Sequence, residues 1–103
     1  MDYKITTTRE AENDIEKITT YLSETLQNPS AADHFLNDLA LCYGHLTRMP
    51  QMYALCPDVR LRALGYRKAV MKNFILVYKV EQAEQTVYVL RVFYGRRDYE
   101  NLF

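Results

Sequence analysis

Two apolar runs in the second half of the chain dominate its hydrophobic pattern. Residues 74–80 and 86–94 are rich in Val, Ile, Leu, Tyr and Phe, the residue types that suit β-strands. Both runs are apolar at odd and at even positions, which is typical of central strands covered on both faces. The more mixed run of residues 66–71 predicts a flanking strand. Only Lys72 and Asn73 separate it from the next strand, which predicts a hairpin in which Asn73 tolerates a positive φ.

The first half of the chain predicts a strand followed by a helix. Residues 3–8 are β-branched and alternating, so they should add a strand to the sheet. Thr7 and Glu10 have the spacing of a capping box, which places the start of a helix beside them. The apolar stripe of this helix is Ala11, Ile15, Ile18, Leu22 and Leu26. The helix should end near Gln27, because Pro29 disfavours helical geometry at the residue before it.

A second helix is predicted to begin at Pro29, with Asn28 or Ser30 as its cap, and to end before Pro50. Its apolar stripe is Ala32, Phe35, Leu36, Leu39, Tyr43 and Leu46. Gly44 weakens the helix by about 1 kcal/mol relative to Ala and is a candidate site of close approach between elements. The short link between the two helices predicts an antiparallel hairpin whose apolar faces pack on the sheet.

The order of elements is strand, helix, helix and then three strands, which predicts an α+β fold. We expect an antiparallel sheet with the helical hairpin packed on one face, and a single domain over residues 1–103. Residues 50–60 show no clear period and include Pro50 and Pro57, so they are expected to form a loop.

Composition and motifs argue against several classes of protein. No apolar run approaches the length of a membrane span, and residues 1–8 lack the apolar core of a signal peptide, so we expect a cytoplasmic protein with no membrane partner. Cys42 and Cys56 fit no metal spacing, and His34 and His45 lie on the second helix away from its apolar stripe. We therefore expect reduced thiols, no metal site and no cofactor.

Charge is divided unevenly along the chain, although the formal net charge is zero. Residues 1–59 carry four basic and nine acidic side chains, a net charge of −5, and residues 60–103 carry nine basic and four acidic ones, a net charge of +5. A local basic patch attracts phosphates even where the average charge does not. We interpret the acidic side chains of the first helix as a solvated face: Glu10, Glu12, Asp14 and Glu16.

Arg91 interrupts the most apolar strand, where an unpaired buried charge would be costly. Strict alternation places it with Val87, Val89 and Phe93, on a face that the helices should leave open to a ligand. The alternative is an ion pair with a carboxylate such as Asp58 or Asp98. Further cations can approach the same face: Arg60, Arg62, Arg67, Lys68, Arg96 and Arg97. Guanidinium groups among tyrosines suit phosphate contact and base stacking, and the same composition also builds protein–protein hot spots.

Three segments of the chain carry a resemblance to a known family. The opening YKITTTREAENDIEKITTYL, the segment GYRKAVMKNFILVYKV and the ending TVYVLRVFYGRRDYENLF together resemble the RelE/ParE superfamily of bacterial type II toxins. The likeness covers nearly the whole chain, and VLRVFYGRRDY is its most specific part. The resemblance implies a growth-inhibiting toxin that is neutralised by a cognate antitoxin and that contacts operator DNA only through that antitoxin.

The family divides by target, and both branches stay open. A ParE-like toxin poisons DNA gyrase and needs no catalytic group of its own. The two long helices, the GRRDY ending and the lack of an ordinary general base favour this branch slightly. A third reading is an inactive toxin fold that only binds a partner.

A RelE-like toxin instead enters the ribosome and cleaves mRNA. On that reading the resemblance implies that Arg91 stabilises the phosphate, that Arg67 or Lys68 is a second cation, and that Tyr94 or Tyr99 is an acid/base or stacking group. Such a tyrosine would need its pKa lowered by neighbouring cations. The remaining basic residues would then bind the target or its phosphates: Arg60, Arg62, Arg96 and Arg97.

Overall fold

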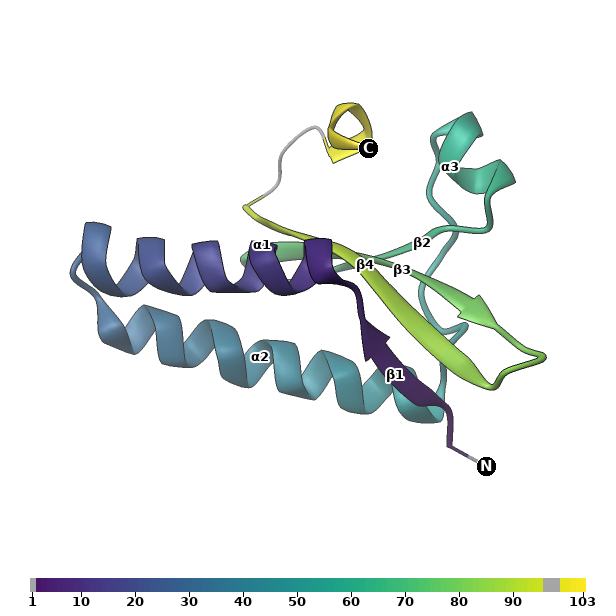
Figure 1. Ribbon diagram of the computed structural model, residues 1–103, viewed down its shortest axis with the longest axis horizontal. Coiled ribbons are helices and arrows are strands. Elements are labelled where there is room, and N and C mark those ends of the chain that lie inside the picture. The colour runs from purple at the N-terminus through teal and green to yellow at the C-terminus, as the bar shows by residue number, and fades with distance from the viewer. Residues whose placement is uncertain (1, 96–98) are drawn as a thin grey trace.

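The computed structural model describes residues 2–95 and 99–103 (Figure 1). Its four strands are β1 (Lys4–Thr7), β2 (Arg67–Val70), β3 (Phe74–Glu81) and β4 (Thr86–Tyr94), and they form one sheet in the order β1–β4–β3–β2. The predicted α+β fold is confirmed, with the three C-terminal strands antiparallel. The first strand departs from the expected antiparallel sheet, because β1 pairs with β4 in parallel. A parallel pair requires a long crossover, and the helical hairpin lies in it.

The first helix, α1 (Arg9–Thr20), is capped one residue later than predicted. The Thr8 hydroxyl accepts a hydrogen bond from the Ala11 amide at 3.2 Å. The expected capping box at Thr7 is wrong, since the Thr7 hydroxyl instead contacts the Tyr43 hydroxyl at 2.7 Å. The helix continues into a π-helical turn, η1 (Tyr21–Thr25), and the chain then turns at Gln27, which has a φ of 50°.

The second helix, α2 (Pro29–Arg48), runs antiparallel to α1 (Figure 1). Asn28 caps it as predicted, because its side chain accepts a hydrogen bond from the Ala31 amide at 3.2 Å. Cys42 is buried beside the predicted stripe, whereas Leu36 of that stripe is 43% exposed. The close approach expected at Gly44 is wrong, because no atom lies within 4 Å of the position that a Cβ would take.

The expected loop of residues 50–60 holds structure that periodicity did not indicate. Leu55 forms an isolated antiparallel bridge with Arg67. The short helix α3 (Val59–Ala63) begins at Asp58, whose carboxylate accepts a hydrogen bond from the Leu61 amide at 3.1 Å. Five residues with one buried apolar side chain, that of Leu61, give too little pattern for a helix to be predicted.

The hairpin between β2 and β3 forms where it was predicted, over Lys72 and Asn73. Asn73 does not adopt the positive φ that an asparagine tolerates. Among the described residues other than glycine, those with a positive φ are Gln27 and Gln85. Gln85 lies in the loop between β3 and β4, whose boundaries match the polar segment in the sequence.

Both faces of the sheet are covered, as the continuous apolar runs of β3 and β4 predicted. On the hairpin side, α1 and α2 pack against buried side chains that include Phe74, Leu76, Tyr78, Val87, Val89 and Val92. On the second face, Ile75, Val77 and Phe93 pack against Cys56, Leu61 and Tyr99. Figure 1 shows α3 and the C-terminal 3₁₀ turn η2 (Tyr99–Leu102) on the opposite side of the sheet from α2. No helix within residues 2–95 and 99–103 is long and apolar enough to cross a membrane.

Candidate target-binding face

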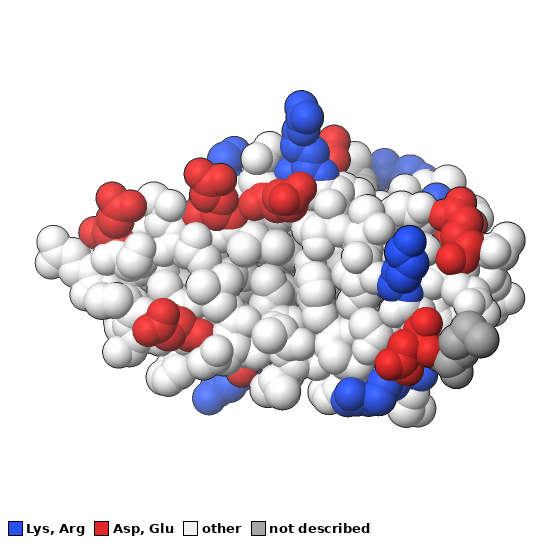
Figure 2. Space-filling view, turned by 60° about the horizontal axis from the view of Figure 1, so that its bottom comes forward, with Lys and Arg blue, Asp and Glu red and all other residues white. Residues whose placement is uncertain are grey.

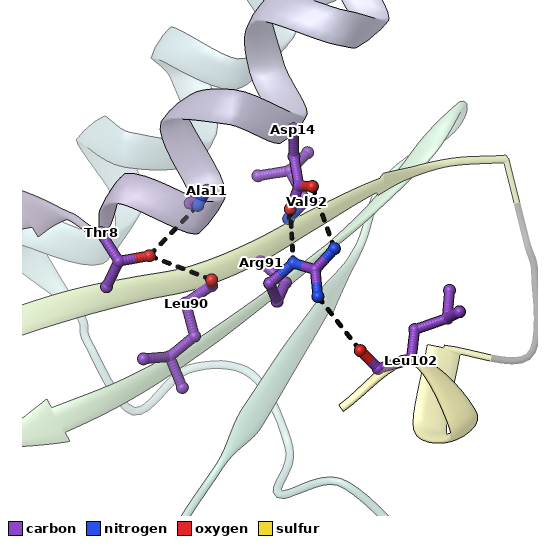
Figure 3. A network of polar contacts seen from close by, with 7 residues as sticks. All are labelled: Thr8, Ala11, Asp14, Leu90, Arg91, Val92 and Leu102. Carbon is purple, nitrogen blue, oxygen red and sulfur yellow. Dashed lines mark hydrogen bonds and ion pairs between the residues drawn. The ribbon is translucent and has the colours of Figure 1, made fainter.

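Arg91 of β4 forms an ion pair with Asp14 of α1 (Figure 3). The Arg91 Nε and Nη2 atoms donate to the two carboxylate oxygens at 2.7 and 3.0 Å. The pair is mostly buried, with the Arg91 side chain 27% exposed and that of Asp14 14% exposed. Hydrogen bonding to Asp14 raises the pKa of Arg91 above its ordinary value. The alternative of an ion pair is therefore the one found, with Asp14 in place of Asp58, which caps α3. Asp98 lies outside the described residues.

The Asp14 carboxylate also hydrogen-bonds to the edge of β4 beyond the end of β1. β1 ends at Thr7, opposite Val89, so the edge of β4 beyond that point has no neighbouring strand. There the Thr8 hydroxyl donates to the Leu90 carbonyl at 3.1 Å, and Asp14 accepts from the Val92 amide at 3.0 Å. Buried backbone groups without partners are costly, so α1 replaces the missing strand with side-chain contacts.

A β-bulge in β4 changes which face Arg91 lies on. Val77 pairs with Arg91 and Tyr78 pairs with Val89, which leaves Leu90 as an extra residue in β4. The predicted strict alternation is therefore wrong. Val89 belongs to the hairpin-side core together with Val87, whereas the Arg91 guanidinium lies over the ring of Phe93 on the second face, 4.9 Å from its centroid.

The second face is not the open surface that was expected. η2 and the last residue of the chain cover it with aromatic side chains: Tyr99 packs near Phe93 at a centroid distance of 6.3 Å, and Phe103 lies 5.6 Å from Tyr66. Tyr99 is only 3% exposed. Arg91 contributes to this cover, since its Nη1 donates to the Leu102 carbonyl at 3.1 Å (Figure 3).

The candidate catalytic residues are divided between the two faces. Tyr94 packs on the hairpin side, where its ring meets Phe35 edge-on at 6.0 Å. Arg67 pairs in register with Tyr78, on the same side, and donates to the Tyr53 carbonyl at 2.7 Å. Lys68, Arg91 and Tyr99 belong to the second face. The structure therefore brings three of the five predicted residues to one face.

Of the predicted catalytic residues, Lys68 and Tyr99 come nearest to forming the expected pair of a cation and a phenol. The Lys68 ammonium lies 5.4 Å from the centroid of the Tyr99 ring. Burial raises the pKa of the Tyr99 phenol, however, so the cation does not produce the lowered pKa that acid/base work at neutral pH requires. The Tyr99 hydroxyl is buried beside the Cys56 thiol, a weak hydrogen-bonding group, and has no stronger partner among the described residues.

Two of the remaining basic residues, Arg60 and Arg62, lie in α3. Arg60 donates to the Glu100 carbonyl at 2.6 Å and so holds η2 from the side of α3. Arg62, also in α3, is exposed. Arg96 and Arg97 lie outside the described residues. Of the four residues predicted to bind phosphate, Arg60 is therefore already engaged in a hydrogen bond within the protein.

A groove of about 530 Å³ borders the Asp14–Arg91 pair. Lys17 and the half-exposed Tyr21 line it from the helical hairpin, Tyr94 lines it from β4, and Leu102 lines it from η2. Sequence reasoning missed Lys17 and Tyr21 as candidate site residues. It also missed Asp14, although a signal was present: Asp14 follows the buried Ala11 by three residues and precedes the buried Ile18 by four, which places it on the packed side of α1.

Comparison with solved structures defines the class of protein to which this fold belongs. The toxin–antitoxin complex RelBE2 from Mycobacterium tuberculosis has a chain that is 20% identical, with a TM-score of 0.66 over 91% of this chain and 99% of that one. A chain of the chromosomal ParDE system of P. aeruginosa is 19% identical, with a TM-score of 0.71 over 91% of this chain and 97% of that one. A chain of the E. coli RelBE complex is 15% identical, with a TM-score of 0.58 over 92% of this chain and 99% of that one. No curated protein sequence matches significantly.

The fold is thus that of the RelE/ParE-like toxins. The sequence model of the ParE toxin of type II toxin–antitoxin systems, parDE, matches residues 5–99. The chain belongs to this family of toxins, and the resemblance seen in the sequence is confirmed.

Proposed function

We propose that this toxin inhibits growth by binding and poisoning DNA gyrase, and that a cognate antitoxin neutralises it. The antitoxin follows from the similar structures, which are toxin–antitoxin complexes of other bacteria. The proposal about the target rests on the arrangement of the candidate catalytic groups described above.

The observation that carries this proposal is the separation of those groups. An mRNA-cleaving site needs a phosphate-binding cation and a general acid/base within reach of one ribose and its phosphate. Here the two candidate tyrosines pack in different cores, and Tyr94, which shares a groove with Arg91, lies near a guanidinium that Asp14 already neutralises. Binding a protein requires no such alignment. The groove offers Tyr21, Tyr94 and Arg91, and tyrosine and arginine are types enriched in protein–protein hot spots.

Cleavage of mRNA on the ribosome is the second candidate function. The approach of Lys68 to Tyr99 favours it, because a cation beside a phenol is the predicted pairing. For this reading, the buried Tyr99 would have to leave its place against Phe93 before it could reach a substrate.

Purified toxin and gyrase test the proposal directly. With plasmid DNA and ATP, we expect loss of supercoiling and accumulation of linear DNA after detergent and protease treatment. A reconstituted translation reaction should keep its mRNA intact. Toxin-dependent transcript cleavage with normal gyrase activity would favour the ribosomal target. If expression in bacteria has no effect on growth, the chain is an inactive toxin fold.

A further inference from the structure

The groove beside the Asp14–Arg91 pair has two walls of different chemistry. Its first wall is a row of side chains at helical spacing on α1 and η1: Asp14, Lys17, Ile18 and Tyr21. Its second wall is the end of β4, residues 91–94, with Leu102 of η2 beside it. The volume of about 530 Å³ lies in the range of small-molecule sites, which is about 300–1,000 Å³.

Two tyrosine rings border this groove, one from each wall. Tyr21 is 46% exposed. Tyr94 is half-buried, and its edge-on contact with Phe35 at 6.0 Å between ring centroids fixes its ring. The buried side chains of Ile18 and Val92 add an apolar surface to the lining. Aromatic and apolar side chains around one groove suit a flat ring, and nucleobases of every kind stack on tyrosine.

The edge of β4 adds hydrogen-bonding groups to the groove. β1 ends before this point, so none of the described strands lies beside β4 at residues 92–94. The Val92 amide points to this edge, where it donates to Asp14 at 3.0 Å, whereas the Gly95 amide donates to the Asn73 carbonyl on the other side. Because backbone groups alternate in direction along a strand, the Val92 carbonyl and the Tyr94 amide point to the groove edge as well. An acceptor and a donor on one edge can meet the polar edge of a base.

The charges around the groove favour a ligand with a single phosphate group. Arg91 neutralises Asp14, so the Lys17 ammonium gives the lining a net positive charge (Figure 3). The surrounding hairpin, residues 9–48, has seven acidic and three basic side chains, a net charge of −4. Figure 2 shows acidic side chains spread over the half of the molecule that holds the hairpin. This surface repels a long run of phosphates, whereas one phosphate beside Lys17 is attracted.

We propose that this groove binds a single nucleotide, with the base against Tyr21 and Tyr94 and the phosphate beside Lys17. The polar edge of the base meets the Val92 carbonyl and the Tyr94 amide. A free nucleotide and one unstacked nucleotide of a DNA strand offer the same chemistry. The inference deepens the proposed function at this groove and rests on it for the second source only, because a toxin that poisons gyrase meets DNA there.

Calorimetry and NMR titration of the purified toxin with AMP test the site. We expect AMP to shift the amide signals of Val92 and Tyr94. Tyr21→Ala should weaken AMP binding by at least about tenfold, because a stacked ring is lost. Lys17→Gln should weaken binding and reduce its dependence on salt. The matched controls are side chains that do not line the groove, and both variants should bind AMP as the unchanged toxin does: Tyr88→Ala and Lys4→Gln.

Circular dichroism establishes first that each variant is folded, and Tyr21→Phe, which keeps the ring, should keep the affinity. A short single-stranded oligodeoxyadenylate distinguishes the two sources of the nucleotide. Tighter binding of this probe than of AMP, lost in Tyr21→Ala, assigns the site to a DNA strand, and equal or weaker binding assigns it to a free nucleotide.

Two results would overturn the proposal. In the first, neither probe shifts the amide signals of Val92 and Tyr94. In the second, inorganic phosphate displaces AMP at equal concentration, because the groove would then recognise only an anion. Gyrase is absent from these assays, so either result leaves the proposed target standing. A toxin that binds AMP in the groove and does not inhibit gyrase would contradict the proposed target alone.

Discussion

Asp14 holds Arg91 through two hydrogen bonds, and the same carboxylate accepts the amide of the next residue in β4. The Arg91 side chain is therefore a structural member of the junction between α1 and the sheet. Any variant at this position changes that junction as well as the charge offered to a target, and the two effects must be measured apart.

We expect Arg91→Ala to lower the free energy of unfolding by about 2–3 kcal/mol, because it leaves the mostly buried Asp14 carboxylate without its cation. The double variant Asp14→Ala, Arg91→Ala should be more stable than the sum of the single losses predicts, with a coupling energy of about 1–2 kcal/mol. Urea denaturation measures both quantities. Additive losses would contradict the ion pair.

The same variants decide whether Arg91 takes part in toxicity. From the sequence we predict that Arg91→Ala abolishes growth arrest. If the double variant is folded and still non-toxic, the loss belongs to Arg91 itself. Growth arrest by a folded Arg91→Ala toxin would remove Arg91 from the functional site.

Tyr99→Phe should leave stability unchanged or raise it by about 1 kcal/mol, because it removes a buried hydroxyl whose neighbour among the described residues is the Cys56 thiol, a weak hydrogen-bonding group. Tyr78→Phe is the matched control: it removes a buried hydroxyl that donates to the Pro50 carbonyl at 2.8 Å, and should cost about 1 kcal/mol. Thermal unfolding compares them. We also expect that replacing Tyr94 and Tyr99 together by Phe leaves gyrase inhibition intact. If growth arrest is lost while gyrase inhibition persists, an acid/base role at another target is supported.

Gly44→Ala should stabilise the protein by about 1 kcal/mol, because the added Cβ meets open space in the interior of α2. Gly65→Ala should do the opposite at a similar magnitude. Space is open there too, but the φ of 79° lies in the left-handed region, which an L side chain disfavours. Chemical denaturation measures the free energy of unfolding of both variants. Because space is open at both positions, a difference in sign reports backbone conformation, and equal effects of the two substitutions would contradict this explanation.

Stability should fall at alkaline pH. Burial raises the pKa of Cys42 to about 11 and that of Tyr78 to about 12, both above their ordinary values of 9.0 and 10.0. The folded state therefore keeps these protons at a pH where the unfolded chain has lost them. Their contribution is complete below about pH 9 and is lost as the pH rises through 11 and 12.

Urea denaturation under reducing conditions measures this loss. From these two groups we expect a decrease of about 2–3 kcal/mol between pH 8 and 10.5, most of it from Cys42. Cys42→Ala should start from a lower stability but lose about 2 kcal/mol less over the same interval. A Cys42→Ala variant with the same pH dependence as the unchanged protein would contradict the raised thiol pKa.

Local pattern was sufficient for most of the secondary structure. The boundaries of β3 and β4 follow their apolar runs, and Asn28 with Pro29 marks the start of α2, because strand burial and helix capping depend on neighbours in the chain. The pattern failed at Leu90, where one extra residue broke the alternation that had placed Arg91. Nothing in the residues 86–94 themselves signals that bulge.

The sequence by itself determined the α+β order of elements, the covered central strands, the uneven charge and the toxin family. Only the tertiary structure decided that β1 joins in parallel, that Asp14 is the partner of Arg91, and that η2 covers the second face. The reason is physical: periodicity and capping act over a few residues, whereas the separation of 77 positions from Asp14 to Arg91 is bridged only when α1 lies along the edge of β4.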